Sequence, residues 1–150
     1  GEALFKYPAE SLAELHAYFA NTYPLLEEIA AKHSGASKIS VWPHHFDMAT
    51  LITLREPTEA GGEDGQSVGA GLSPGDGGNP LPYWYVTPWP YPDAARLPTL
   101  SAGRWNTDGW VGAQLDARDV FALPSDQQAA AVRAFLTEAV QASVDLIRGV

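Results

Sequence analysis

A single segment decides the fold: residues 38–54, which read KISVWPHHFDMATLITL. It is rich in β-favouring residues and contains one strong breaker, Pro43, so it predicts one long strand over 38–54. Inside it, the run Trp42-Pro43-His44-His45-Phe46-Asp47 gathers two imidazoles, a carboxylate and two large rings. A strand would hold these side chains on a rigid element, and sheet packing alone does not call for them. The segment therefore also predicts a candidate site.

Helical patterns lie on both sides of this segment. Ser11 and Glu14 form a capping-box pair at a predicted helix start, and apolar residues recur at helical spacing up to Ile29. Pro24 interrupts that pattern and indicates either a kink or a second helix. At the other end, Ser125 begins a second capping box, S-x-x-Q, and Gly149 is placed to end the helix. The expected buried stripe of this last helix is Val132, Phe135, Leu136, Ala139, Val140, Ser143, Val144 and Ile147.

Further strands are expected between the two helical regions, over 66–72, 83–89 and 110–115, with a helical turn over 116–122. A polar, glycine-rich stretch over 56–66 reads as a hairpin connection. The order of helix, strands and helix predicts an α+β fold. We expect a single domain over residues 1–150, in which an antiparallel sheet of about four strands packs against the N-terminal and C-terminal helices.

Composition excludes several classes of function. The apolar fraction of 45% is typical of a globular protein, and no stretch approaches the roughly 20 apolar residues that span a bilayer. A net charge of −9 disfavours nucleic acids and anionic membranes as partners. The absence of cysteine excludes thiol nucleophiles and zinc–cysteine sites. No signal-peptide pattern opens the sequence, and we expect the cytoplasm as its location.

The histidine-rich run leaves four interpretations open, one of which is a ligand pocket without a metal. In a regular strand, His45 and Asp47 share one face, with Phe46 and Met48 on the other. His45 and Asp47 could then bind a divalent metal with a further ligand from His44, Asp76 or Asp108, or act as a base and its orienting carboxylate. They could equally form a hydrogen-bonded pair that fixes the strand.

A glycine-rich segment over 69–78 provides a second candidate. Its glycines permit a close backbone approach, and Ser73 and Asp76 could present polar atoms to a ligand, although a plain turn explains the segment equally well. It lacks the G-K-[ST] ending of a phosphate loop, the dinucleotide fingerprint and the G-x-S-x-G elbow. We therefore predict no cofactor.

The third candidate is the aromatic strand over 83–89. Strand alternation puts Tyr83, Tyr85, Thr87 and Trp89 on one face and Trp84 and Val86 on the other, which predicts that both faces are covered. The first face could stack on a planar ligand, form a subunit interface or complete the core.

Taken together, these motifs resemble the later half of a bacterial family of unknown function. The similarity covers roughly residues 12–148, and the matching positions are Trp42, Phe46, Asp47, Pro74 and Gly75. His45 stands where that family has a small residue, which weakens the metal interpretation. Leu72-Ser73 replaces an aromatic pair, and a larger N-terminal part of the family has no counterpart here. The resemblance implies no activity.

Our leading hypothesis is a small-molecule-binding domain. The predicted binding residues are Trp42, His44, His45, Asp47, Ser73, Asp76, Tyr85 and Trp89. The second hypothesis is a metal-dependent, hydrolase-like enzyme that uses His45 and Asp47 as ligands. The third is a structural or homodimerisation domain without a ligand.

Overall fold

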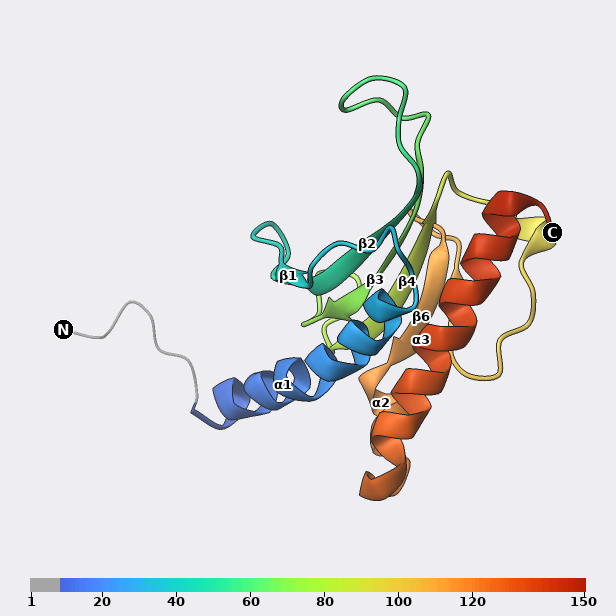
Figure 1. The fold of residues 1–150 in the computed structure, drawn as a ribbon. Coiled ribbons are helices and arrows are strands. Elements are labelled where there is room, and N and C mark those ends of the chain that lie inside the picture. Colours follow the sequence, from blue (N-terminus) through green and yellow to red (C-terminus); the bar gives the residue numbers. More distant parts are fainter. Residues whose placement is uncertain (1–8) are drawn as a thin grey trace.

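The computed structural model describes residues 9–150, with side chains described from residue 13 onward. Its centre is one antiparallel sheet of six strands in the order β1-β2-β3-β4-β6-β5 (Figure 1). The strands are β1 Ser40–Val41, β2 Met48–Arg55, β3 Gln66–Ser73, β4 Tyr83–Trp89, β5 Arg104–Asn106 and β6 Gly112–Asp116. The helices are α1 Ala9–Ala31, the short η1 Ala94–Arg96, α2 Ala117–Phe121 and α3 Ser125–Arg148.

The predicted α+β class with an antiparallel sheet between terminal helices is confirmed, but the sheet has six strands instead of about four. The two unexpected strands are the edges of the sheet. The long strand predicted over 38–54 is divided into β1 and β2, and β1 has only two residues. β5 has three residues. Strands this short carry too few residues for an alternating pattern to be recognised.

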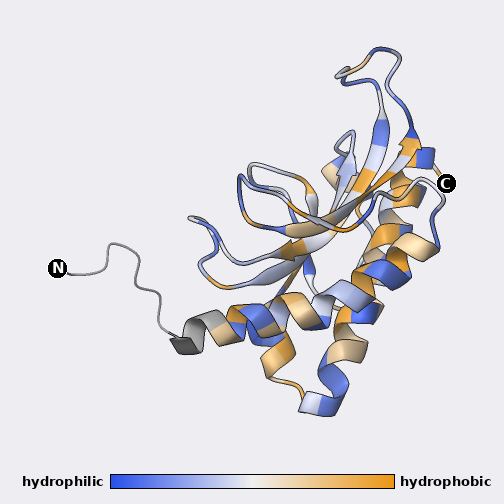
Figure 2. Ribbon diagram, turned by 60° about the vertical axis from the view of Figure 1, so that its left-hand side comes forward, coloured by the Kyte–Doolittle hydropathy of each residue, from blue (hydrophilic) through white to orange (hydrophobic). Residues whose placement is uncertain are grey.

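One face of the sheet carries the hydrophobic core. The rows Met48–Leu72–Trp84–Leu115 and Thr50–Ala70–Val86–Ala113 follow from the strand registers, and all of these side chains are buried. All of them except the polar Thr50 form one cluster with apolar residues of α1 and α3. Orange apolar positions alternate with blue polar ones along α3, as an amphipathic helix requires (Figure 2). The opposite face of the sheet, here called the open face, is not covered by any helix of residues 9–150.

The C-terminal helix follows its predicted course with one correction. The predicted stripe is buried except for Ile147, which is partly buried, and Leu146 is buried in addition. Gly149 ends the helix with a φ of 73°, in the left-handed region that suits glycine. The predicted capping box is wrong, because the N-cap residue is Pro124 and its side chain makes no cap. Gln128 instead donates through Nε2 to the Leu123 carbonyl at 3.1 Å.

The N-terminal helix continues without interruption. Pro24 lies inside α1, so the alternative of two separate helices is wrong. Pro24 is exposed, whereas Thr22, Leu25 and Leu26 beside it are buried. Packing of that buried side holds the helix together across the proline, which lacks a backbone donor. Within residues 9–150, no helix combines the length and apolar character needed to cross a membrane.

Candidate functional site

The histidine-rich run is a loop, and the prediction of a strand through it is wrong. It connects β1 and β2, and the Trp42 amide donates to the Asp47 carbonyl while the Phe46 amide donates to the Trp42 carbonyl, each at 2.8 Å. Phe46 has a φ of 55°, which reverses the chain. Pro43 lacks the amide proton that a strand ladder would use, which explains why pairing stops there.

This loop separates the run's side chains. Trp42, His44 and Phe46 are exposed to solvent, with 47% of Trp42 and 66% of Phe46 accessible. Asp47 lies where β2 begins, and it turns to the open face together with Ala49 two residues later. There the Tyr85 hydroxyl of β4 donates a short hydrogen bond to Asp47 Oδ2.

Gly71 makes this contact between β2 and β4 possible. It lies on β3 between Ala49 and Tyr85, and the Tyr85 ring passes over it. A Cβ at position 71 would lie 2.6 Å from the Met48 carbonyl oxygen and 2.9 Å from Tyr85 Oη. The absence of a side chain therefore leaves the space through which Tyr85 reaches Asp47.

A second tyrosine–aspartate pair lies beside the first. The Tyr83 hydroxyl donates to Asp76 Oδ2 at 2.7 Å. Asp76 Oδ1 also accepts from the amides of Gly78 and Asn79, each at 2.8 Å. Gly75, with a φ of 111°, gives the loop its sharp turn, and a Cβ there would meet the Pro80 carbonyl oxygen at 2.8 Å. The loop thus holds the Asp76 carboxylate in one orientation.

Both pairs have shifted acid–base properties. The hydrogen bond from Tyr83, followed by the two loop amides, lowers the pKa of Asp76 against the opposing effect of burial. Burial, followed by the Asp76 hydrogen bond, raises the pKa of Tyr83 to about 12. Burial and the bond to Asp47 also raise the pKa of Tyr85. At neutral pH, both tyrosines are therefore neutral donors and Asp76 is ionised.

These residues surround a cavity of about 520 Å³ on the open face, here called the open-face pocket. Its lining is His45, Asp47, Ser73, Asp76, Gly77, Gly78, Tyr83, Tyr85, Thr87 and Trp110. Of the eight residues predicted to bind a ligand, the fold brings five together here: His45, Asp47, Ser73, Asp76 and Tyr85. Ser73 is buried at its edge, where its hydroxyl accepts from the Gly75 amide at 3.2 Å.

The other three predicted residues, Trp42, His44 and Trp89, do not line the pocket. Trp42 and His44 are directed away from it by the β1–β2 loop. Trp89 lies at the far end of β4, where its indole nitrogen donates to the Glu63 carbonyl at 3.1 Å. Its ring meets Tyr91 edge-on at a centroid distance of 5.2 Å. Sharing a strand face with Tyr85 was therefore insufficient to place Trp89 in the pocket.

Sequence reasoning also missed five lining residues in its choice of binding residues: Gly77, Gly78, Tyr83, Thr87 and Trp110. Tyr83 and Thr87 share the alternating face of Tyr85, and this signal could have identified them. Trp110 reaches the pocket from the loop between β5 and β6, whereas the sequence predicted it as the first residue of the strand over 110–115.

A neighbouring carboxylate shows a different electrostatic arrangement. Asp116 on β6 forms a 2.7 Å ion pair with Arg104 and accepts hydrogen bonds from Gln114 and Asn79. Burial opposes ionisation, but these partners lower the pKa of Asp116 overall. By contrast, no Lys, Arg or His side chain from residue 13 onward lies within 4 Å of the carboxylates of Asp47 or Asp76. The open-face pocket thus holds two carboxylates that form no ion pair with a described side chain, although the charge of His45 in its lining also lowers the pKa of Asp76.

The metal hypothesis needs a third ligand beside His45 and Asp47. Across the described part of the chain, no three His, Asp or Glu side chains are grouped so that they could hold a metal ion. His45 lies in the exposed β1–β2 loop, and Asp47 is directed to the Tyr85 hydroxyl. The pocket is therefore better suited to hydrogen bonding and charge pairing than to metal coordination.

Comparison of the chain with protein-family models, curated proteins and solved structures finds no match. The resemblance to a bacterial family of unknown function therefore stays a prediction.

Proposed function

We propose that this domain binds a small cationic molecule, specifically one with a primary ammonium group, in the open-face pocket. The observation that carries the proposal is the contrast between Asp116, which pairs with Arg104, and Asp47 and Asp76, which form no ion pair with a described side chain. His45 is the one imidazole among the described lining residues, and it lies in an exposed loop. An ammonium group placed between these two carboxylates would supply the missing charge.

The remaining pocket residues fit such a ligand. Tyr83, Tyr85 and Trp110 offer aromatic faces, which attract cations and pack against an apolar ligand body. Each tyrosine hydroxyl already donates to an aspartate, so it orients the carboxylate without cancelling its charge. The net charge of −9 also favours the approach of a cation over that of an anion.

A set of three probes that share a phenylethyl group but differ in charge tests the proposal. Phenethylamine carries a positive charge, phenethyl alcohol is neutral and 3-phenylpropionate is negative. Isothermal titration calorimetry should detect binding of the amine. Binding of the alcohol should be weaker or undetectable, and the anion should not bind. Equal affinity for all three probes, or preference for the anion, would contradict the proposal.

Two variants test whether the pocket carboxylates bind the amine. Asp47→Asn and Asp76→Asn keep the shape of each side chain and remove its charge. Loss of one charged hydrogen bond should weaken phenethylamine binding by roughly tenfold to a hundredfold. Asp119→Asn is the matched control, because Asp119 is exposed on α2 and outside the pocket. An Asp119→Asn effect as large as the other two would show that overall charge, and not the pocket, attracts the amine.

A further inference from the structure

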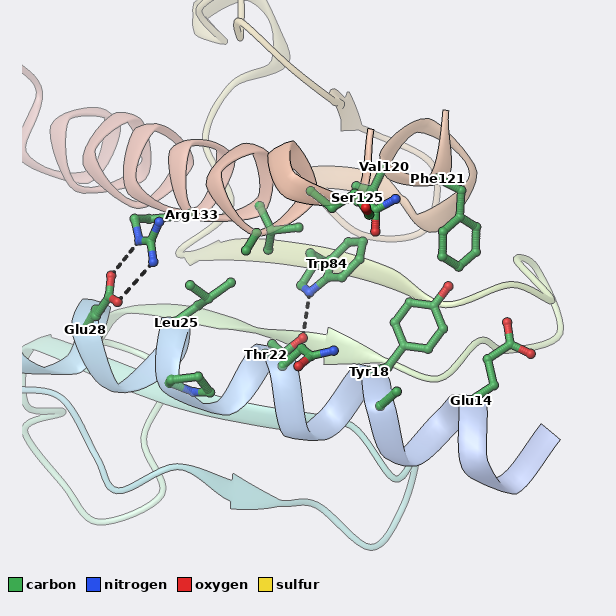
Figure 3. A pocket seen from close by; sticks show the side chains of 16 residues that line it. Glu14, Tyr18, Thr22, Leu25, Glu28, Trp84, Val120, Phe121, Ser125 and Arg133 are labelled. Atoms are coloured by element: carbon green, nitrogen blue, oxygen red, sulfur yellow. Dashed lines mark hydrogen bonds and ion pairs between the residues drawn. The ribbon is translucent and has the colours of Figure 1, made fainter. Parts of the chain in front are cut away.

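A second cavity lies on the other side of the sheet, between the two long helices. It measures about 580 Å³ and is lined by residues of α1, α2 and α3 and by Trp84 of β4 (Figure 3). We call it the interhelical cleft. Trp84 stands between the helices, with Leu25 on the α1 side (Figure 3). Val132 of α3 is also part of the lining. The interior of the cleft is thus mainly apolar.

The entrance of the cleft is polar but contains no free cation among the described residues that line it. Arg133 is its one basic lining residue, and both Nε and Nη2 bond the carboxylate of Glu28, at 2.8 and 3.3 Å. Glu14 brings a negative charge to the other end, as the close view shows (Figure 3). A negatively charged ligand would therefore meet repulsion without an available partner.

One buried polar group in the cleft lacks a partner. Tyr18 is only 9% exposed, and its hydroxyl makes no hydrogen bond with the part of the chain that the structure describes. It points away from α1 toward Phe121, whose ring centroid lies 5.7 Å from its own (Figure 3). The Trp84 indole differs, because its Nε1 donates to Thr22 Oγ1 at 3.0 Å. Buried hydroxyls normally find a partner, so that of Tyr18 has an unused capacity to donate a hydrogen bond.

We propose that the interhelical cleft binds a neutral, largely apolar small molecule, and that the Tyr18 hydroxyl donates a hydrogen bond to an oxygen of that molecule. The Trp84, Leu25 and Val132 side chains would contact its apolar body. Because Trp84 and Tyr85 project from opposite faces of β4, this site is separate from the open-face pocket.

Prodan provides a direct probe. It is an uncharged naphthalene dye with one ketone oxygen, and its emission shifts to the blue in apolar surroundings. Titration of the protein into prodan should give a saturable blue shift with one site per chain. No saturable shift up to the solubility limit of prodan would overturn the proposal.

Tyr18→Phe tests the hydroxyl while keeping the ring. Removing one neutral hydrogen bond should weaken prodan binding by about threefold to tenfold without lowering the melting temperature, since the hydroxyl has no partner in the free protein. Unchanged affinity in Tyr18→Phe would overturn the assignment of this hydroxyl as the donor.

Ala129→Phe tests the location, because Ala129 lines the cleft and a larger side chain would fill it. Its matched control is Ala130→Phe, the next exposed position of α3 and not part of the lining. We expect loss of prodan binding in the first and retention in the second, with both melting cooperatively. Equal prodan affinity in the two variants would place the dye elsewhere and overturn the proposal, and phenethylamine binding should be unaffected in both.

Discussion

The two faces of β4 use aromatic residues in opposite ways. Toward the helices, Trp84 joins a continuous apolar core, and its indole proton is bonded to the hydroxyl of Thr22. Toward the open face, Tyr83 and Tyr85 bond the carboxylates of Asp76 and Asp47. The first arrangement buries apolar area, whereas the second holds charge in fixed positions. We therefore expect substitutions on the helix face to change mainly stability and those on the open face to change mainly binding.

The largest effect on stability should come from substitutions on the side of the sheet that faces the helices. Phe135 of α3 is 1% exposed within the core, so Phe135→Ala should lower the free energy of unfolding by about 3–5 kcal/mol. Phe121→Ala is the control, since that ring is 55% exposed and should cost less than about 1.5 kcal/mol. Urea unfolding measures both. Equal losses would show that the core does not dominate stability.

The second-largest effect should be a difference in stability between alanine substitutions at two glycines on the open face of β3. A Cβ at Gly71 would meet the Met48 carbonyl oxygen at 2.6 Å, whereas at Gly69 the nearest atom, the Thr87 carbonyl oxygen, is 3.9 Å away. We expect Gly71→Ala to destabilise by about 2–3 kcal/mol and to weaken amine binding by displacing Tyr85. Gly69→Ala should change stability by less than about 1 kcal/mol. If the two variants had equal stability in urea unfolding, the conclusion that Tyr85 packs closely over Gly71 would be contradicted.

A smaller effect concerns the coupling between Asp47 and Tyr85. Asp47→Asn, Tyr85→Phe and the double variant form a cycle that should give a coupling free energy of about 1.5–2 kcal/mol, because a charged hydrogen bond joins the two side chains. Unfolding free energies of the four proteins supply the number. The same cycle with Asp119→Asn should be additive, and additivity of the Asp47 cycle would exclude the bond.

The smallest effect is a dependence on alkaline pH. The pKa of Tyr83 is raised to about 12 in the folded protein, so folding favours its protonated form. The resulting stability is present below the unfolded pKa near 10 and is lost as the pH rises from about 10 through 12. Tyr83→Phe should remove about 1 kcal/mol of this pH dependence, after allowance for solvent screening at the pocket. Urea midpoints at pH 8, 10.5 and 11.5 test it, and parallel curves for wild type and variant would contradict it.

Regular alternation made much of the sheet predictable. The boundaries of β4 and the assignment of Tyr83 and Trp84 to opposite faces follow from period-two patterning alone. The apolar stripe of α3 was equally readable, because its spacing persists over many turns. These elements depend on local sequence, and they are present in the structure as predicted.

The parts that could not be predicted are one local break in a strand and several contacts between distant segments. The strand expected through Trp42–Asp47 is broken by Pro43 and by the left-handed Phe46, and Phe46 carries no glycine-like signal. Trp110 enters the open-face pocket from a loop whose path is set by the pairing of β5 with β6. The interhelical cleft exists because α1 and α3 diverge over Trp84. The apolar periodicity within each helix does not indicate the distance between the two helices.

The most direct test of the account is a map of amide chemical shifts during titration with phenethylamine. We predict that the largest changes in the ¹H–¹⁵N spectrum fall on Asp47, on Asp76 to Asn79 and on Tyr83 to Tyr85, with little change along α1 and α3. Changes confined to those helices, or spread evenly over the acidic surface, would contradict the open-face pocket as the binding site.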